Sequence, residues 1–367
     1  MSFYSVTRVN CFEKMDLPFT EKKIRPVLND EVARKLVEKL YGFKVKSIQE
    51  LNSYDDKNYR IICYPEFENI YVKNIANEGY VLKIINSLDS QDKACIEGQN
   101  EMMLYLNKCN ISCSIPIPNL CGSYYSLEKL RSKDTTEHIV RLLVFCPGEI
   151  LYNAKISPEL LFDVGYFITV LNEALSEFYH YSYQNRNHLW TLLALPRLHD
   201  YLFVIKNEND KLLIKDIIKS FETNIVNNLD QFDKGMIHGD LNEQNILINS
   251  EHNKIIGIID FGDTQYSCLI FELSIALCYM ILQACDITAG KYVIKGYTSK
   301  NKLSNYEKKI LKIAVCARMC QSLVLGIHSH LNEPDNNYLI VTQKSGWDIL
   351  RELWPMKDDD IIKLWGL

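Results

Sequence analysis

The chain reads His238-Gly239-Asp240-Leu241-Asn242-Glu243-Gln244-Asn245 and, after two short apolar runs, Ile259-Asp260-Phe261-Gly262-Asp263. Phosphoryl transfer needs one carboxylate that orients a hydroxyl nucleophile and accepts its proton, and further oxygen ligands that hold Mg²⁺ on the phosphates. Asp240 suits the first task, and Asn245 with Asp260 suits the second. Either stretch alone would be weak evidence, but together they indicate a metal-dependent phosphoryl-transfer site.

The residues between the two stretches predict an antiparallel hairpin. The apolar runs 246–248 and 255–259 flank the polar, turn-prone run 249–253. Such a hairpin brings Asn245 and Asp260, at its two outer ends, side by side. A rigid hairpin with two oxygen ligands can bind a hard cation in a fixed position. Phosphoryl transfer relies on such positioning and on charge neutralisation. We expect His238 to organise the loop rather than act as acid or base, since Asp240 already supplies the carboxylate.

The two stretches resemble the kinase-like phosphotransferases that act on small molecules, among them aminoglycoside, choline and homoserine kinases. Those enzymes carry His-Gly-Asp where protein kinases carry His-Arg-Asp, and Gly239 stands here in place of that arginine. Nothing after Asp263 resembles the Ala-Pro-Glu segment of a protein kinase. The resemblance therefore argues against a protein substrate.

Within that superfamily the chain resembles the hydroxylysine kinase family. The resemblance implies transfer of the γ-phosphate of GTP, or else ATP, to the side-chain hydroxyl of 5-hydroxy-L-lysine, with Mg²⁺. Spacing and composition indicate only a phosphotransferase, so another small alcohol (homoserine, choline, ethanolamine or an aminoglycoside) and a catalytically silent nucleotide-binding scaffold remain alternatives. The segments that carry the resemblance are Ser53-Tyr54-Asp55-Asp56-Lys57-Asn58, Tyr80-Val81-Leu82-Lys83-Ile84, Val140-Arg141-Leu142-Leu143, Asp260-Phe261-Gly262-Asp263 and Cys320-Gln321-Ser322-Leu323-Val324.

Lys83 is the expected phosphate-binding lysine. Residues 78–85 read as a strand in which Lys83 shares a face with apolar neighbours, and a charge on an apolar face needs a partner. In kinases the strand lysine contacts the α- and β-phosphates and a helix glutamate. The predicted helix 93–108 offers Glu97 and Glu101, one turn apart, and the family's early position for this residue favours Glu97. The alternatives are a lysine that reaches water and a solvated glutamate.

Two further segments are expected to contact the nucleotide. Residues 52–59 lack glycine, but Ser53, Asp55 and Asn58 could form a turn whose backbone N–H groups face phosphate. Asp55 beside a polyanion is unfavourable unless a cation compensates. The buried strand 141–145 ends in a rigid Pro-Gly turn at 147–148, which predicts a hinge at Phe145 where a purine would bind; an ordinary strand-to-helix turn would look similar.

The substrate side is expected after Asp263. Arg318 interrupts the apolar series of the predicted helix 305–330, so it points inward and must find an anion. In an amino-acid kinase the substrate carboxylate could supply that anion, while Asp263 and Glu272 could receive an ammonium group. An internal Arg318–Glu272 salt bridge without any ligand is an equal alternative.

Bulk properties restrict the remaining choices. The net charge of −5 gives no electrostatic reason to expect nucleic acid or an anionic membrane as partner. The N-terminal residues lack the apolar core of a signal peptide, and the twelve cysteines show no CxxC spacing, so we expect free thiols and a cytoplasmic protein. The apolar stretch 310–327 contains Lys312, Arg318 and Gln321, which would be costly in lipid and indicate a core helix. Oligomeric state is not indicated.

The sequence thus predicts an α+β, two-lobed, protein-kinase-like fold. A lead-in of residues 1–28, loosely ordered, precedes a small mixed lobe with an antiparallel sheet at 29–148. A larger, mainly helical lobe at 149–367 then carries the catalytic and substrate residues. At 367 residues the chain fits one two-lobed catalytic unit better than two independent modules.

Overall fold

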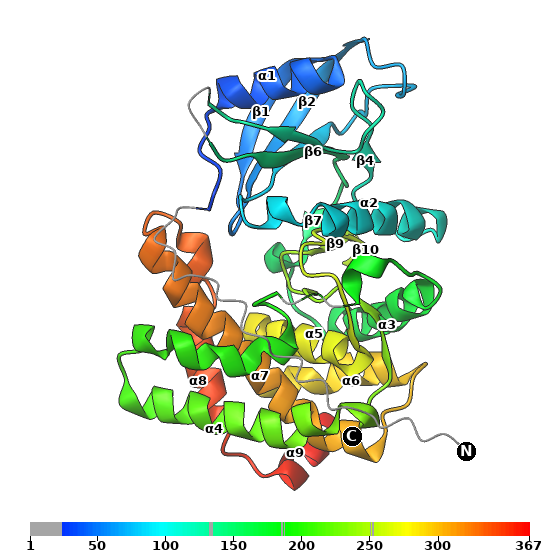
Figure 1. Cartoon of the computed structure of the whole chain (residues 1–367). Coiled ribbons are helices and arrows are strands. Elements are labelled where there is room, and N and C mark those ends of the chain that lie inside the picture. Colours follow the sequence, from blue (N-terminus) through cyan, green and yellow to red (C-terminus); the bar gives the residue numbers. More distant parts are fainter. Residues whose placement is uncertain (1–23, 132–134, 185, 187, 250, 252) are drawn as a thin grey trace, which may run out of the picture.

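The computed structural model describes residues 24–131, 135–184, 186, 188–249, 251 and 253–367. The chain forms two lobes, a small N-terminal one built on an antiparallel sheet and a larger, mainly helical one (Figure 1). Each lobe has its own hydrophobic core, so each can hold its shape while facing the other. The predicted α+β, two-lobed fold is confirmed.

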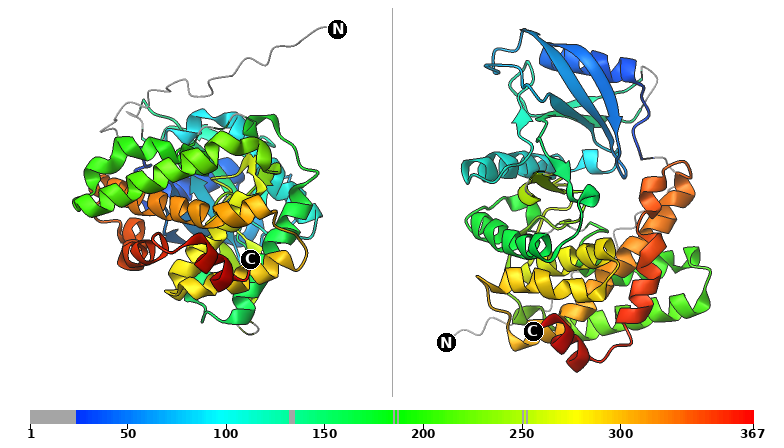
Figure 2. Two further views of the ribbon diagram at one scale, coloured as in Figure 1. Left: turned by 90° about the horizontal axis from the view of Figure 1, so that it is seen from below. Right: turned by 180° about the vertical axis from the view of Figure 1, so that it is seen from behind.

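The small lobe is an antiparallel sheet with one helix on its outer face (Figures 1 and 2). The strand order is β1-β2-β3-β6-β4, and β5 also pairs with β6. Helix α1 begins where Asn29 caps it and ends at Gly42, which adopts the left-handed conformation. The elements are α1 (Asp30–Tyr41), β1 (Phe43–Leu51), β2 (Lys57–Phe67), β3 (Tyr80–Ile84), β4 (Pro116–Ile117), β5 (Ser126–Glu128) and β6 (His138–Val144).

Helix α2 (Lys93–Lys108) lies between the sheet and the large lobe (Figure 1). The side chain of Asp92 caps its first turn. Its apolar residues Met102, Met103 and Leu106 belong to the large-lobe core. The helix therefore connects the two lobes mechanically.

The large lobe is a cluster of helices around two small sheets. Strand β7 follows the hinge and pairs with β9 of the hairpin, while β11 pairs with β8. The helical elements are α3 (Pro158–Leu175), α4 (Glu208–Asn224), α5 (Leu269–Ala284), α6 (Gly290–Thr298), α7 (Asn305–Asn332), α8 (Gln343–Leu353) and α9 (Asp358–Trp365), with a 3₁₀ run at Leu192–Val204 and shorter ones at Asp89–Gln91, Leu151–Asn153, Tyr181–Tyr183, Val226–Gln231, Ile287–Ala289 and Asn337–Ile340. The strands are β7 (Glu149–Ile150), β8 (Lys234–Ile237), β9 (Ile246–Asn249), β10 (Lys254–Ile258) and β11 (Gln265–Cys268).

Helix α7 crosses the large lobe and reaches toward the small one (Figures 1 and 2). It is long and apolar enough to span a membrane, yet 94% of its apolar window is buried inside the protein. Ser304 and Glu307 start it with reciprocal hydrogen bonds. The helix is therefore a core element, as the sequence predicts.

The predicted lead-in needs one correction. Residues 1–23 lie outside the described part of the chain, but residues 24–28 pack onto the molecule. The guanidinium of Arg25 forms an ion pair with Glu333 and donates to the hydroxyl of Ser53 at 3.2 Å. This short segment is therefore held by charge between the small lobe and the end of α7.

Candidate active site

A cleft of about 540 Å³ separates the lobes and is lined by residues of both. Among the described residues, its walls carry seven carboxylates against three permanent cations, Lys83, Arg141 and Arg318, and the imidazole of His188, which gives a formal excess of four negative charges with His188 neutral. Such a cleft suits metal cations and positively charged small molecules. The acidic residues are Asp55, Asp56, Asp89, Asp240, Glu243, Asp260 and Asp263.

Asp240 lies on this wall and is held by three donors. Arg318 donates to its Oδ1 at 2.7 Å, while Asn242 and Asn245 donate to its Oδ2 at 2.9 and 2.7 Å. Burial raises the pKa of Asp240 to about 6, although the charge of Arg318 opposes that rise. A carboxylate fixed in this way, with a pKa just below neutrality, is suited to accept a proton from a hydroxyl.

The loop around Asp240 is built by buried polar groups. His238 donates from Nε2 to the Ile259 carbonyl at 3.1 Å, so its Nδ1 can accept the Asp240 N–H at 3.3 Å. Burial lowers the pKa of this imidazole, which agrees with an organising role. Gly239 has φ +80°, and a Cβ there would lie 2.4 Å from the Asp263 carbonyl oxygen. Only glycine fits that position.

Glu272 does not take the role predicted for it. Its carboxylate is fully buried below the loop and accepts the backbone N–H groups of His238 and Gly239. It is absent from the cleft lining, so it cannot receive a substrate ammonium group. Glu272 instead fixes the backbone that presents Asp240.

The predicted hairpin is present, and it brings Asn245 and Asp260 together. Strands β9 and β10 pair antiparallel, and Ile259 donates to the Asn245 carbonyl at 2.9 Å. The amide nitrogen of Asn245 faces Asp240, because a carboxylate only accepts, so its Oδ1 is left for a cation. Burial would raise the pKa of Asp260, but Lys83 lowers it to about 2. An ionised carboxylate and an amide oxygen fit Mg²⁺, which takes one or two protein ligands besides phosphate and water.

Lys83 occupies the expected place, but its partners differ from the prediction. Its ammonium group lies 3.0 Å from Asp260 and 3.2 Å from Asp56. Glu97 lies on the exposed face of α2 and accepts a hydrogen bond from Tyr125 at 3.0 Å. The proposed Lys83–Glu97 pair is therefore wrong, and Asp56 of the β1–β2 loop supplies the second carboxylate.

Arg141 is a site residue that the sequence reasoning did not assign. It pairs in register with Lys83 across β6 and β3, is 1% exposed and lines the cleft. Its hydrogen-bond partners are two neutral amides of α2, Asn100 at 3.0 Å and Gln99 at 2.7 Å. A second buried cation beside Lys83 suits phosphate. The argument made for Lys83, a charge inside an apolar strand, would have found it.

The loop between β1 and β2 covers the cleft from the small lobe. Ser53 donates to the Asp56 carbonyl at 2.7 Å, and Asp56 in turn accepts the Asn86 N–H at 2.8 Å. The loop also rests on the large lobe, because the Tyr54 hydroxyl bonds to Ser329 on α7 at 2.8 Å. Residues 54–56 form a bend after Ser53, and the expectation that its backbone N–H groups face phosphate stays a prediction. Asn58 lines the cleft with its Oδ1 buried and unpaired among the described residues.

Phe145 lines the cleft at the hinge, just after β6 ends. Its N–H donates to the Gly79 carbonyl at 3.0 Å, so this group is not free to bind a purine. The Arg60 guanidinium lies 3.9 Å from the centre of its ring. Phe145 could therefore meet a base through its ring edge or its carbonyl.

Arg318 is buried as predicted, and its partner within the protein is Asp240 rather than Glu272, while its role toward a substrate carboxylate stays a prediction. Besides Asp240, it donates to the Trp190 carbonyl at 2.9 Å, and its charge lies 5.0 Å from the Trp190 ring centre. It makes no ion pair with Glu272. Asp263 does line the cleft, where its carboxylate lies 3.3 Å from Nδ1 of His188. Burial raises the pKa of Asp263 to about 6.

We expect Arg318→Met to lower turnover by roughly tenfold to a hundredfold, the cost of one charge-assisted hydrogen bond. Because Arg318 holds down the pKa of Asp240, its loss should raise that pKa and move the acidic limb of the kcat profile upward. The kcat of the variant, relative to wild type, should therefore be lower at about pH 6 than at about pH 8.

The measurement is a kcat profile over this pH range, with Lys312→Met as matched control. Lys312 is another buried cation of α7, but it pairs with Asp358 at 2.8 Å, away from the cleft. An unshifted profile together with a raised KM for the acceptor would instead assign Arg318 to substrate binding.

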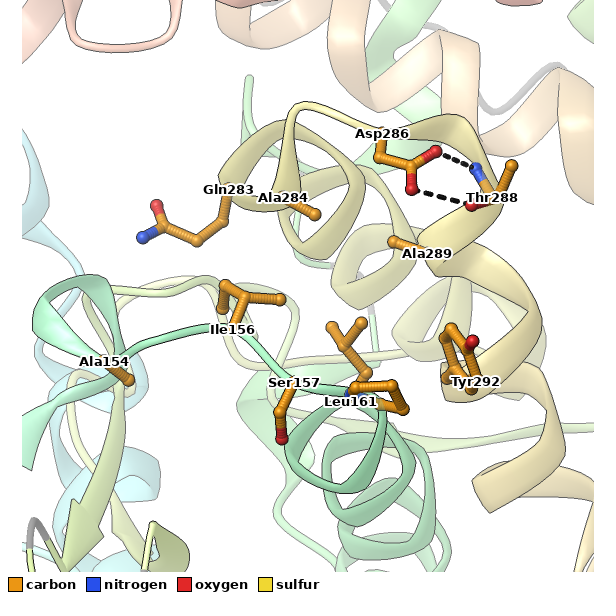
Figure 3. A pocket seen from close by; sticks show the side chains of 11 residues that line it. Ala154, Ile156, Ser157, Leu161, Gln283, Ala284, Asp286, Thr288, Ala289 and Tyr292 are labelled. Carbon is orange, nitrogen blue, oxygen red and sulfur yellow. Dashed lines mark hydrogen bonds between the residues drawn. The ribbon is translucent and has the colours of Figure 1, made fainter.

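A second hollow, of about 510 Å³, lies between α3 and the start of α6 (Figure 3). Its lining includes Ile156, Leu161, Ala284 and Tyr292. The one carboxylate there, Asp286, already accepts two hydrogen bonds from Thr288, at 2.8 and 2.7 Å. Its polar groups are thus engaged, and the catalytic chemistry gathers in the cleft.

Comparisons with known proteins agree with this geometry. Residues 66–299 match the family described as "Phosphotransferase enzyme family". A hydroxylysine kinase of Xenopus laevis is 34% identical to the chain over 93% of this chain and 94% of its own length. A hydroxylysine kinase of Bos taurus is 31% identical over 93% of each.

Among solved structures, an amicoumacin kinase in complex with AMP-PNP and Ca²⁺ is similar in fold. The TM-score is 0.65, at 16% identity, and the match covers 91% of this chain and 97% of that one. This likeness supports the protein-kinase-like arrangement of the two lobes.

Proposed function

Because the chain belongs to the phosphotransferase enzyme family, and within it to the hydroxylysine kinases, we propose that it transfers the γ-phosphate of GTP to the side-chain hydroxyl of 5-hydroxy-L-lysine. The product would be 5-phosphohydroxylysine. At the coarser level, the protein is a small-molecule phosphotransferase with an alcohol group as acceptor.

The observation that carries the proposal is the convergence of Asp240, Asn245 and Asp260 at one edge of the cleft. A proton acceptor and two oxygen ligands are present, and Lys83 and Arg141 lie beside them. Lys83, Asp240, Asn245 and Asp260 are all retained, which disfavours a catalytically silent scaffold.

The geometry suggests how the residues act. The acceptor hydroxyl would lie against Asp240, its oxygen would attack the γ-phosphorus, and the bond to the nucleoside diphosphate would break. The hydroxyl proton would pass to the Asp240 carboxylate. Bound Mg²⁺, held by Asn245 and Asp260, would neutralise phosphate charge, and Lys83 would contribute a further positive charge.

The donor and the location are proposals that rest on different grounds. GTP as the donor follows from the family resemblance alone. Cytoplasmic location agrees with the free thiols found at the described cysteines.

The test is a steady-state phosphotransfer assay with purified protein and Mg²⁺. The donors are GTP and ATP, and the acceptors are 5-hydroxylysine, homoserine, choline, ethanolamine and an aminoglycoside. We expect turnover selective for 5-hydroxylysine with GTP, as the relationship to the hydroxylysine kinases implies. The acidic cleft favours an acceptor with two ammonium groups over homoserine, choline and ethanolamine, which carry one positive charge each.

Other outcomes would revise the proposal at different levels. Turnover of another alcohol would keep the mechanism and replace the substrate, and a preference for ATP would replace only the donor. Nucleotide binding without turnover on any acceptor would overturn the proposed reaction.

A further inference from the structure

Glu243 is a buried carboxylate on the cleft wall that none of the roles above uses. It is 8% exposed, and its Oε2 accepts no hydrogen bond from any residue that the structure describes. An unpaired carboxylate oxygen is costly to bury, so such groups are rare without a functional reason. A partner from outside the chain would remove that cost.

The position of Glu243 is fixed by the turn that follows Asp240. The side-chain oxygen of Asn242 accepts the N–H groups of Gln244 at 2.8 Å and Asn245 at 3.0 Å. On the other side, Tyr152 donates its N–H to the Glu243 carbonyl at 2.8 Å. The turn that presents the proton acceptor and a metal ligand therefore presents Glu243 as well.

Glu243 also differs from three other carboxylates of the cleft, Asp56, Asp240 and Asp260, in lacking a cation. Lys83 serves Asp56 and Asp260, and Arg318 serves Asp240, whereas no ion pair with a described residue involves Glu243. The unpaired Oε2 of Glu243 is therefore available to accept a hydrogen bond from a positively charged group of a ligand.

Aromatic rings line the same part of the cleft. Burial raises the pKa of the phenols of Tyr279 and Tyr338, and the charge on Glu243 contributes in both cases. Glu243 thus lies within electrostatic range of both rings, and both line the cleft. A cleft that contains a carboxylate and aromatic rings is an environment that favours an ammonium group.

We propose that Glu243 binds the ammonium group that the substrate carries next to its reacting hydroxyl, and so selects ammonium-bearing alcohols. The inference rests on the proposed function and names a specificity residue for it. In 5-hydroxylysine the carbon beside the hydroxyl carbon carries the ε-ammonium group. When the hydroxyl lies against Asp240, that group extends toward the next carboxylate of the same turn.

The experiment compares wild type and Glu243→Gln on two acceptors. One is 5-hydroxylysine, and the other is 2-amino-5-hydroxyhexanoic acid, in which hydrogen replaces the terminal ammonium group. Wild type should prefer 5-hydroxylysine in kcat/KM by at least roughly thirtyfold, the lower range for losing one partner of a buried charge pair. Glu243→Gln should lose most of that preference and keep the wild-type KM for nucleotide.

Glu272→Gln is the matched control, because Glu272 is also buried behind this loop but holds only backbone N–H groups. It should slow both acceptors by the same factor and leave the preference intact. Thermal unfolding of both variants shows whether either has lost its fold.

The outcomes separate this inference from the proposed function. Equal slowing of both acceptors by Glu243→Gln would overturn the inference and leave the proposed function standing. If wild type prefers ethanolamine, whose ammonium group is also next to the hydroxyl carbon, the proposed substrate fails, and the same comparison with ethanol decides on Glu243. A preference for homoserine, whose ammonium group is one carbon further away, would overturn both the proposed substrate and the inference. If wild type accepts no ammonium-bearing alcohol, both are overturned.

Discussion

Replacing Asp240 by asparagine will lower kcat by roughly two to four orders of magnitude, the usual contribution of a general base. An amide cannot accept the hydroxyl proton, yet it keeps the size of the side chain and one oxygen for Arg318. The residues that we expect to bind the nucleotide, Lys83, Arg141 and Phe145 at the hinge, are unchanged in this variant, so nucleotide affinity should change little. Single-turnover kinetics and nucleotide binding by calorimetry measure the two effects separately.

The variant needs a control for stability, because Arg318 is 1% exposed and would lose its carboxylate. A buried charge without its partner is destabilising. The double variant Asp240→Asn with Arg318→Met removes both charges, so its unfolding temperature should lie above that of Asp240→Asn alone while turnover stays low. Turnover that returns with the double variant would assign the defect to folding, and turnover retained in the single variant would contradict the mechanism.

The parts of the site that the sequence predicts correctly depend on short-range chemistry. The hairpin of β9 and β10 follows from two apolar runs and the polar residues between them, and its geometry places Asn245 beside Asp260. The strand that carries Lys83 follows likewise from the apolar residues around it, since 78–85 was predicted and β3 spans Tyr80–Ile84. In both cases the determining residues are neighbours along the chain.

The choice of Glu97 fails for a reason that no local pattern reveals. Helix α2 was correctly bounded, but its rotation against the sheet decides which residues face Lys83. The inward positions carry the amides Gln99 and Asn100, which hold Arg141, and Glu97 faces outward. The carboxylate that Lys83 needs comes instead from Asp56, in a loop whose fold depends on contacts with Asn86.

The partners of Glu272 and Arg318, which lie on long helices, could not be predicted from local sequence patterns either. Helices α5 and α7 are buried along most of their length, so their apolar pattern does not point to one inward face. Charge placement predicted that Arg318 would need an anion, and it has one. That the anion is Asp240, and that Glu272 serves two backbone N–H groups, follows only from how the helices pack around the loop.

Replacing Asp260 by asparagine is expected to lower turnover by roughly a hundredfold to ten-thousandfold, matching the several kcal/mol that a bound metal contributes. The Asp260 carboxylate is ionised at neutral pH, because Lys83 lowers its pKa to about 2 against the effect of burial. It also adopts φ +62°, a strained conformation for a residue other than glycine. That strain is tolerated where the surrounding contacts fix a functional side chain.

The measurement is turnover as a function of Mg²⁺ concentration, with Asp263→Asn as the matched control. Asp263 lies three residues on and lines the same cleft, but burial raises its pKa to about 6 and its nearest basic group is His188 rather than Lys83. Asp260→Asn should need far more Mg²⁺ for half-maximal rate, because a neutral amide binds a hard cation more weakly than a carboxylate does. Asp263→Asn should keep the wild-type requirement. If the two variants show the same Mg²⁺ dependence, the metal is not bound by Asp260, and the assignment of the metal-binding site to the ends of the hairpin is wrong.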